Sequence, residues 1–351
     1  MPALNTDTID TDLLWNRYRN NFSRHMLGVA RYVQHSVMNT LQEQCGHRDL
    51  RLSFSPYIHL LRQGDMRLSE LADILGISRQ ACNQAVKQVE AAGYITRTAD
   101  PDDGRAKQLT LSKSGRKLSR DGERIVTRLD QHFAQLVGKP ELADTGKSLD
   151  SLTRQLSPRT NRPHSHSQHA QVGALLARLS DYIMRRLMEL NYAKGHTGLK
   201  LSFAQVLTMI GPQGGRIQQM AAAHDVSKQA ISAIATELEA LGYLQRQADP
   251  LDARQLVLQF TPRGQALIAD SVASVDQLEQ EFGAIIGSAA LKQMKDTLYA
   301  LYRALQLEQD IFDLSGTVDI ALLARQLRQQ LGTDNSRALA ELLLQPATNP
   351  R

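Results

Sequence analysis

The sequence predicts a mainly α-helical protein built from two copies of one domain, each carrying a small β-hairpin. The first observation is an internal repeat, because the stretch Ser78 to Gln108 occurs again as Ser227 to Val257 at a constant offset of 149 residues. The second is that no insertion or deletion separates the copies. The third is the order of patterns in each copy, where a helical stripe precedes two short strand-like segments.

The repeated stretch opens with a helix that a serine is expected to cap. The hydroxyl of Ser78 or Ser227 can accept hydrogen bonds from the free amides of the first turn. In the first copy Cys82, Val86 and Val89 recur at helical spacing and form one apolar stripe, so this side of the helix is expected to be buried. The second copy has the matching stripe Ile231, Ala235 and Leu238.

Each of these helices ends at a glycine, Gly93 or Gly242, and is followed by a β-hairpin. A short apolar strand leads to a charged tip, Asp100 to Arg105 or Asp249 to Arg254, and a returning strand alternates with period two. The preceding short helices are expected at residues 68–75 and 217–224. Two helices, a hairpin and a further long helix make a winged helix-turn-helix, here in tandem.

The hairpin resembles that of the MarR-type bacterial transcription regulators. The family's wing pattern is Asp-Pro-x-Asp-x-Arg after a Gly-hydrophobic-hydrophobic-x-Arg turn, and both parts stand in each copy, from Gly93 to Arg105 and from Gly242 to Arg254. The family often has a second Arg directly before the last one, where this chain has Gly104 and Ala253. That difference weakens the charge of the wing and keeps the arginine at its tip.

The resemblance implies a dimer whose long terminal helices form the core while two winged domains read adjacent half-sites. Because this chain contains both halves, we expect an intramolecular pseudo-dimer and a monomeric protein. One long amphipathic helix is predicted from Leu13 to Gln44, with a counterpart from Ala170 to Lys194. The expected divisions are a first domain at 1–156, a linker at 157–168, a second domain at 169–312 and a C-terminal helical extension at 313–351.

The polar face of the repeated helix offers donors suited to base edges and phosphates. Such a face can also be an ordinary solvated surface, but its place as the second helix of a helix-turn-helix favours contact with double-stranded DNA. The candidates in the first copy are Ser78, Arg79, Gln80, Asn83, Gln84 and Lys87. The second copy has fewer long donors, namely Ser227, Lys228, Gln229, Ser232 and Thr236.

The arginine at each wing tip is a further candidate for DNA contact. Arg105 and Arg254 can pair with Asp103 and Asp252 as ordinary surface residues do, or can enter the minor groove and meet its negative potential. The two recognition helices differ in sequence, so the preferred DNA site is expected to be an imperfect palindrome.

A small-molecule effector is expected from the resemblance alone. The family's pocket lies between the dimer helices and the winged domain and often takes small aromatic acids, so an aromatic or anionic effector is implied. The residues placed to line it are Tyr18, Phe22, His25, His59 and Arg62, although packing of the helix core explains the apolar members equally well.

Charge, cysteine count and the length of apolar runs limit the kinds of protein and of site that are expected. The 41 Lys and Arg against 36 Asp and Glu give a net charge of +5, compatible with nucleic acid but common in other proteins. Two cysteines, Cys45 and Cys82, are too few for a disulfide framework or a thiolate metal site, and Cys82 falls on the apolar stripe. No apolar run approaches the roughly 18 residues of a membrane span and no signal peptide is visible, so a cytoplasmic protein without membrane contact is expected.

The expected function is a sequence-specific DNA-binding transcription regulator, a repressor that responds to a small molecule. The alternative is a duplicated ligand-binding or protein-binding module, such as an antirepressor, that keeps the fold without DNA binding. No paired carboxylates, zinc-protease motif or nucleophile elbow appears, so neither an enzyme nor a catalytic, metal or cofactor site is expected.

Overall fold

The computed structural model describes residues 6–99, 107–156, 171–211, 214–223, 227–249 and 252–307. The predicted first wing tip, the linker and the C-terminal extension lie outside the described residues. A helix α1 (Thr6–Arg19) comes first, and the two copies of the repeat follow.

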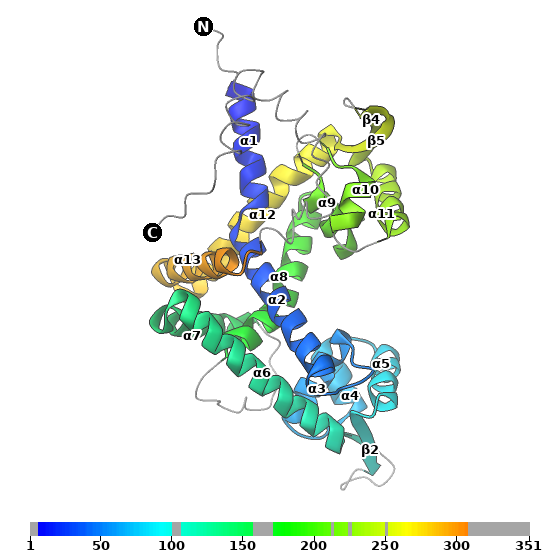
Figure 1. The fold of residues 1–351 in the computed structure, drawn as a ribbon, viewed down its shortest axis with the longest axis vertical. Helices are drawn as coiled ribbons and strands as arrows, with labels where there is room; N and C mark the ends of the chain where they lie inside the picture. Colours follow the sequence, from blue (N-terminus) through cyan, green and yellow to red (C-terminus); the bar gives the residue numbers. More distant parts are fainter. Residues whose placement is uncertain are drawn as a thin grey trace, which may run out of the picture.

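The two copies repeat the same order of elements, which confirms the predicted tandem winged-helix fold (Figure 1). The first copy contains α2 (Phe22–Glu43), a 3-10 turn η1 (Leu52–Phe54), α3 (Ser55–Arg62), β1 (Met66–Arg67), α4 (Leu68–Leu75), α5 (Arg79–Ala91), β2 (Ile95–Ala99), β3 (Lys107–Leu111), α6 (Lys113–Val137) and α7 (Lys139–Leu156). The second contains α8 (Val172–Ala193), α9 (Leu201–Met209), α10 (Ile217–Ala223), α11 (Lys228–Ala240), β4 (Leu244–Asp249), β5 (Asp252–Phe260), α12 (Pro262–Ile286) and α13 (Ser288–Ala304).

The first wing is a three-stranded antiparallel sheet in the order β1-β3-β2, in which Ile95 lies opposite Leu111. Both of these side chains are buried beneath the sheet. The second wing pairs β4 with β5, and Gly215 bridges to Leu258 in the position that β1 occupies in the first. Gly93, at a φ of 81°, turns the chain from α5 into the wing as the sequence predicted.

The prediction of one helix from Leu13 to Gln44 is wrong, because the chain breaks between α1 and α2. Asn21 caps α2 with its side-chain oxygen, which accepts from the backbone N–H of Arg24 at 3.0 Å. The Asn21 amide donates to the carbonyls of Arg17 and Tyr18 at 3.1 and 2.9 Å. One side chain thus satisfies free groups at both helix ends, while the apolar spacing runs through the break unchanged.

Helix α1 packs against the second copy rather than the first. Trp15 is only 7% exposed and lies 5.3 Å from the ring of Phe260, within the apolar core of the second winged region. Arg17 donates to both carboxylate oxygens of Asp276 on α12 at 2.7 Å. The N-terminal helix therefore braces a domain that begins more than 150 residues later in the chain.

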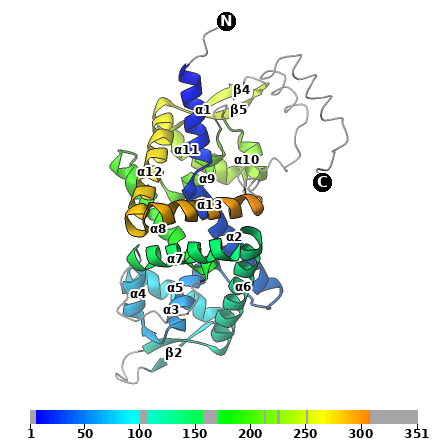
Figure 2. The ribbon, with the colours of Figure 1, turned by 90° about the vertical axis from the view of Figure 1, so that its left-hand side faces the viewer.

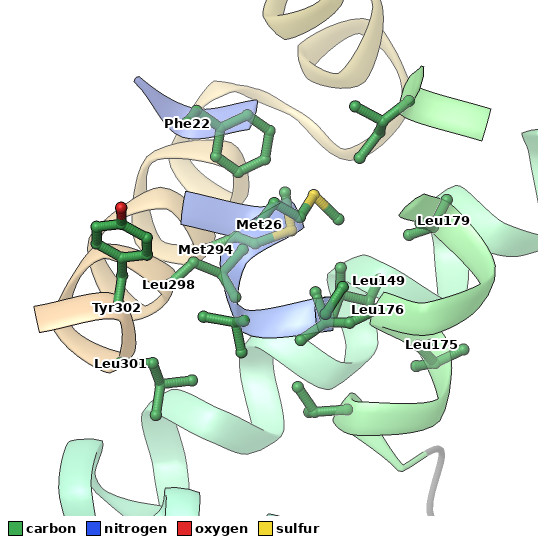
Figure 3. Close-up of a cluster of buried hydrophobic side chains, with 14 of the residues drawn as sticks. Phe22, Met26, Leu149, Leu175, Leu176, Leu179, Met294, Leu298, Leu301 and Tyr302 are labelled. Atoms are coloured by element: carbon green, nitrogen blue, oxygen red, sulfur yellow. The ribbon is translucent and has the colours of Figure 1, made fainter. Parts of the chain in front are cut away.

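The two copies share one central core. Figure 3 shows side chains of α2, α7, α8 and α13 converging on a single cluster, with Met26 beside Met294 and Leu149 beside Leu176. These helices form a central layer from which the two winged regions project at opposite ends. Both regions lie on the side of the molecule away from α7 and α13, as the two views agree (Figures 1 and 2). The arrangement is a pseudo-dimer within one chain.

Candidate nucleic-acid interface

Helix α5 of the first copy has the cap and the buried stripe that its sequence predicts. The Ser78 hydroxyl accepts from the backbone N–H of Ala81 at 3.1 Å. Cys82, Val86 and Val89 are completely buried. Burial raises the pKa of the Cys82 thiol, which suits a small core residue and disfavours a reactive thiolate. The face opposite this stripe is consequently directed away from the core.

That outer face carries most of the predicted DNA-contacting residues. Arg79, Gln80, Gln84 and Lys87 are exposed, and Asn83 is half-buried beside them. α5 lies at the outer edge of the first winged region, on the side from which both winged regions project (Figure 1). The structure therefore brings these donors together on one surface.

Arg97 of strand β2 holds Asn83 and was not among the predicted site residues. Its Nε donates to Glu90 at 3.0 Å, and its terminal nitrogen donates to the Asn83 side-chain oxygen at 3.1 Å. A guanidinium has only donors, so this contact fixes the Asn83 oxygen toward Arg97 and leaves the amide NH2 directed elsewhere. The repeated arginine after each glycine turn was visible in the sequence, but its partner on the helix was not.

Helix α11 of the second copy repeats the construction with a less polar outer face. The Ser227 hydroxyl accepts from Ala230 N–H at 3.1 Å, and the stripe Ile231, Ala235 and Leu238 is buried. The predicted contact residues Lys228, Gln229 and Thr236 are exposed, whereas Ser232 is half-buried.

The hydroxyl of Thr236 is already used within the protein. It donates to the carbonyl of Ser232 at 2.9 Å and accepts from Arg246 at 3.2 Å. Arg246 also pairs with Glu239 at 2.6 Å, as Arg97 does with Glu90 in the first copy. The second recognition helix is left with Lys228 and Gln229 as its long donors among the predicted residues.

The wing arginines are not placed by the structure. Arg105 lies outside the described residues, and Arg254 is described only as part of the backbone of β5. Minor-groove contact by either side chain remains a prediction.

A histidine–aspartate pair anchors each winged region to the long helix that follows it, buried in the first copy and half-buried in the second, and sequence reasoning missed both pairs. His47 Nε2 lies 3.0 Å from Asp121 of α6, and His196 Nε2 lies 2.9 Å from Asp270 of α12. The hydrogen bond from Lys117 is the largest cause that lowers the pKa of Asp121 to about 2, and the bond with His47 contributes too. Both pairs recur at the repeat offset, which was the signal that could have revealed them.

The structure places the five predicted effector-binding residues in different surroundings and brings only two of them together. Phe22 and His25 line a pocket of about 390 Å³ against α12 and α13. Tyr18 instead packs on Trp15 with ring centres 5.8 Å apart, and burial raises the pKa of its hydroxyl. His59 and Arg62 lie exposed on α3, which packs against α6, and Arg62 pairs with Glu123 at 2.9 Å. Tyr18 precedes the break between α1 and α2, and the length of α2 separates Phe22 and His25 from His59 and Arg62.

The described residues offer neither a metal site nor a membrane-spanning helix. Among the residues that the structure describes, no group of His, Cys, Asp and Glu side chains could hold a metal ion. In the same part of the chain, every helix is too short or too polar to cross a membrane.

Comparison with known proteins places this surface in a family. Residues 58–106 and 197–255 match the family model "MarR family", once in each copy and across the helix-turn-helix and part of the wing. Two regions of the chain thus match this family in tandem. The wing pattern, the capped recognition helices and most of the repeat fall inside the matched segments.

The MarR-family regions have relatives of known name. The HTH-type transcriptional repressors Rv2887 of Mycobacterium tuberculosis and Mb2911 of Mycobacterium bovis are 29% identical over 84 residues, which is 24% of this chain. The chain spans 60% of the length of these relatives. The match with the structure of a MarR-family regulator from Rhodococcus sp. RHA1 (24% identity, TM-score 0.31) covers 40% of this chain and 97% of that regulator. The structure of CouR from Rhodococcus jostii RHA1, solved with p-coumaroyl-CoA, is 27% identical in sequence with a TM-score of 0.31. The match covers 39% of this chain and 95% of CouR.

Proposed function

We propose that the protein is a DNA-binding transcription regulator that reads two adjacent half-sites with a single chain. The observation that carries this proposal is the pair of recognition helices, α5 and α11, which both project on the side away from α7 and α13 (Figure 1). Exposed Arg79, Gln84 and Lys87 supply donors for guanine and adenine edges and for phosphates. The tandem MarR-family regions support the same class of function.

The two half-sites should be read unequally. The first copy presents several long donors, whereas the second presents Lys228 and Gln229 beside a Thr236 whose hydroxyl is occupied. Each good bidentate base contact contributes about 1 to 3 kcal/mol of discrimination. The first half-site should therefore be strongly specified, and the second should depend on phosphate contacts and on groove shape through Arg254. The preferred site is an imperfect palindrome.

Repression controlled by a small molecule is the regulatory part of this proposal. The curated relatives are named transcriptional repressors, which supports repression as the direction. The pocket between the first turn of α2 and helices α12 and α13 supports a ligand site in the shared core. Each copy, at 1–156 and 169–312, would act as one winged domain of the internal dimer.

Selection of bound sequences from a random DNA pool tests the proposal. The wild type should select an imperfect palindrome; Asn83→Ala should relax base preference in one half-site, and the matched Ser232→Ala should change it little. Affinity should fall with salt at a log–log slope of roughly 0.9 per phosphate contact. A perfect palindrome equally sensitive to both substitutions contradicts the asymmetry. Absence of binding even at low salt favours the duplicated module that has lost DNA contact.

A further inference from the structure

We propose that the chain has one regulatory ligand site, placed between α1 and helices α12 and α13, which takes a small protonated aromatic amine. The site would act on the second winged region alone. Its effect on DNA rests on the function proposed above, whereas binding of the amine does not.

The pocket has the size and the surfaces for a single aromatic ring. Its volume of about 390 Å³ lies in the range of small-molecule sites. Phe22 and Val275 supply apolar walls, and the His25 ring lies 4.9 Å from that of Tyr299. Tyr299 is 39% exposed, so part of its ring is open to a ligand. Aromatic faces of this kind attract cations as well as other rings.

The charges at the pocket favour a cation over an anion. Three carboxylates, of Asp276, Glu279 and Asp296, line it beside the two cations Arg17 and Lys295. Arg17 is already bidentate on Asp276, and Lys295 is paired with Glu279. An entering carboxylate would have to displace one of these acids and would meet the remaining two. An entering ammonium can instead use free lone pairs of the same carboxylates.

One nearby cation lies outside the lining and does not change this balance. Lys292 pairs with Asp296 at 2.7 Å, but the two side chains are 79% and 65% exposed. Exposed pairs are strongly screened by water and contribute little. Asp296 therefore stays available to a ligand at the rim of the pocket.

The described residues at the equivalent position in the other half are arranged differently. Asp130 contacts the start of α8 there, accepting from the backbone N–H groups of Val172 and Gly173 at 2.8 and 2.9 Å. Gln171 donates to Thr127 at 2.6 Å. The residues that correspond to the pocket residues Val275, Asp276 and Glu279 by the repeat offset are Val126, Thr127 and Asp130.

The caps of the two core helices differ among the described residues. Helix α2 is capped by its own Asn21, so Glu279 is released to pair with Lys295 and the space in front of it stays open. Helix α8 has no side-chain cap of its own at Gln171, and Asp130 of α6 takes that place. Among the described residues, the two positions therefore differ in what the acidic side chain contacts: Lys295 for Glu279, and the start of α8 for Asp130.

The pocket adjoins the contact that holds the second winged region. Arg17 lines the pocket and Trp15 lies half a turn earlier on α1, packed on Phe260 in the core of that region. The Arg17–Asp276 pair is itself half exposed, at 50% and 47%, so it holds α1 only weakly, and a ligand ammonium that competes for Asp276 weakens it further. The expected consequence is a shift of α1 and a looser second winged region, while the first has no such brace among the described residues.

The chain contains a built-in probe, since Trp15 is its only tryptophan. Phenethylamine should change the Trp15 emission in a saturable way, and calorimetry should give one molecule per chain. Phenylacetate, with the same ring and the opposite charge, should cause no change at equal concentration. Tyr299→Ala should weaken phenethylamine binding roughly tenfold, and Asp150→Ala, at the matched position of the first copy, should leave it unchanged.

Each other outcome decides against a part of the proposal. Tighter binding of phenylacetate overturns the ligand class, and two molecules per chain overturn the one-sided site. With the selected DNA, phenethylamine should reduce footprint protection over the second half-site only; equal loss over both overturns the coupling. Normal titration without any DNA binding leaves the site standing and removes the proposed function. DNA binding without any phenethylamine binding overturns the ligand site and leaves the proposed function standing.

Discussion

Arg97 shows how a residue outside the recognition helix can set what that helix reads. Bidentate recognition of adenine needs an amide that accepts from N6 and donates to N7. The Asn83 oxygen is already bonded to Arg97, so the group that remains is the NH2 donor. A donor alone suits the acceptor edge of guanine better than the mixed edge of adenine.

Arg97→Met should therefore shift base preference. Freeing the Asn83 oxygen should move the preference at the contacted base from guanine toward adenine, by up to about tenfold, because a bidentate contact contributes about 1 to 3 kcal/mol. Competition binding with site variants that differ at this base measures the shift. The matched variant Arg246→Met should cause no such shift from guanine to adenine in the second half-site, since Ser232 stands where Asn83 does and the group it frees is the Thr236 hydroxyl. An unchanged preference in Arg97→Met contradicts this role.

Two glycines of α6 differ sharply in the space around them. A methyl group at Gly115 would lie 2.0 Å from the carbonyl oxygen of Tyr94, and at Gly122 it would meet nothing within 4 Å. Gly115→Ala should lower the free energy of unfolding by about 1 to 3 kcal/mol through overpacking. Gly122→Ala should raise it by about 0.5 to 1 kcal/mol, because alanine is the better helix former. Chemical denaturation of both variants checks the opposite signs.

At the scale of elements, the attachments of the helices decide how the winged regions are held. Asn21 separates α1 from α2 and lets α1 reach the second winged region through Trp15. The bond between His47 and Asp121 joins the loop after α2 to α6 in the first copy. These contacts, rather than the wing itself, connect DNA-facing elements to the central core.

The Asp121 attachment should give stability a defined pH dependence. Its pKa in the folded protein, about 2, is below the ordinary value of 3.8, so its contribution is present above about pH 4 and is lost as pH falls toward 2. Asp121→Asn should remove this dependence. Lys117→Met should instead move the loss to higher pH, because Lys117 is the main cause of the lowered pKa. Unfolding followed between pH 5 and 2 tests both, and identical curves for all three proteins contradict the assignment.

At the scale of the whole molecule, neither half has a complete core of its own. Met26, Val29 and Phe133 of the first half are buried in the same cluster as Leu176 and Phe282 of the second. Surfaces of this size and composition are stable only when covered. The internal dimer is therefore a condition for folding as well as a way to present two recognition helices.

The fragment from Met1 to Ser157 should accordingly form a homodimer or aggregate. Sedimentation of the fragment beside the full chain measures this, and the full chain serves as the control because it contains both halves of the cluster. A stable, well-behaved monomer of the fragment would count heavily against a shared core.

The sequence by itself determined the tandem winged helices, because the apolar periodicity, the helix caps and the glycine turns each depend on residues that are close in sequence. Ser78, the stripe at Cys82, Val86 and Val89, and the turn at Gly93 each depend on contacts within a few positions. The polar face of α5 followed from the same stripe. The predicted fold and the exposed part of the recognition face could be read for that reason.

Only the tertiary structure decided which surfaces meet. Spacing alone could not reveal that α1 breaks at Asn21 and packs on the second copy, since apolar periodicity is the same whichever partner covers it. The Arg97 contact with Asn83 and the Asp130 contact with the start of α8 join groups that no local pattern links. Such contacts depend on the direction of whole helices, which is set by how two imperfect copies fill one shared core.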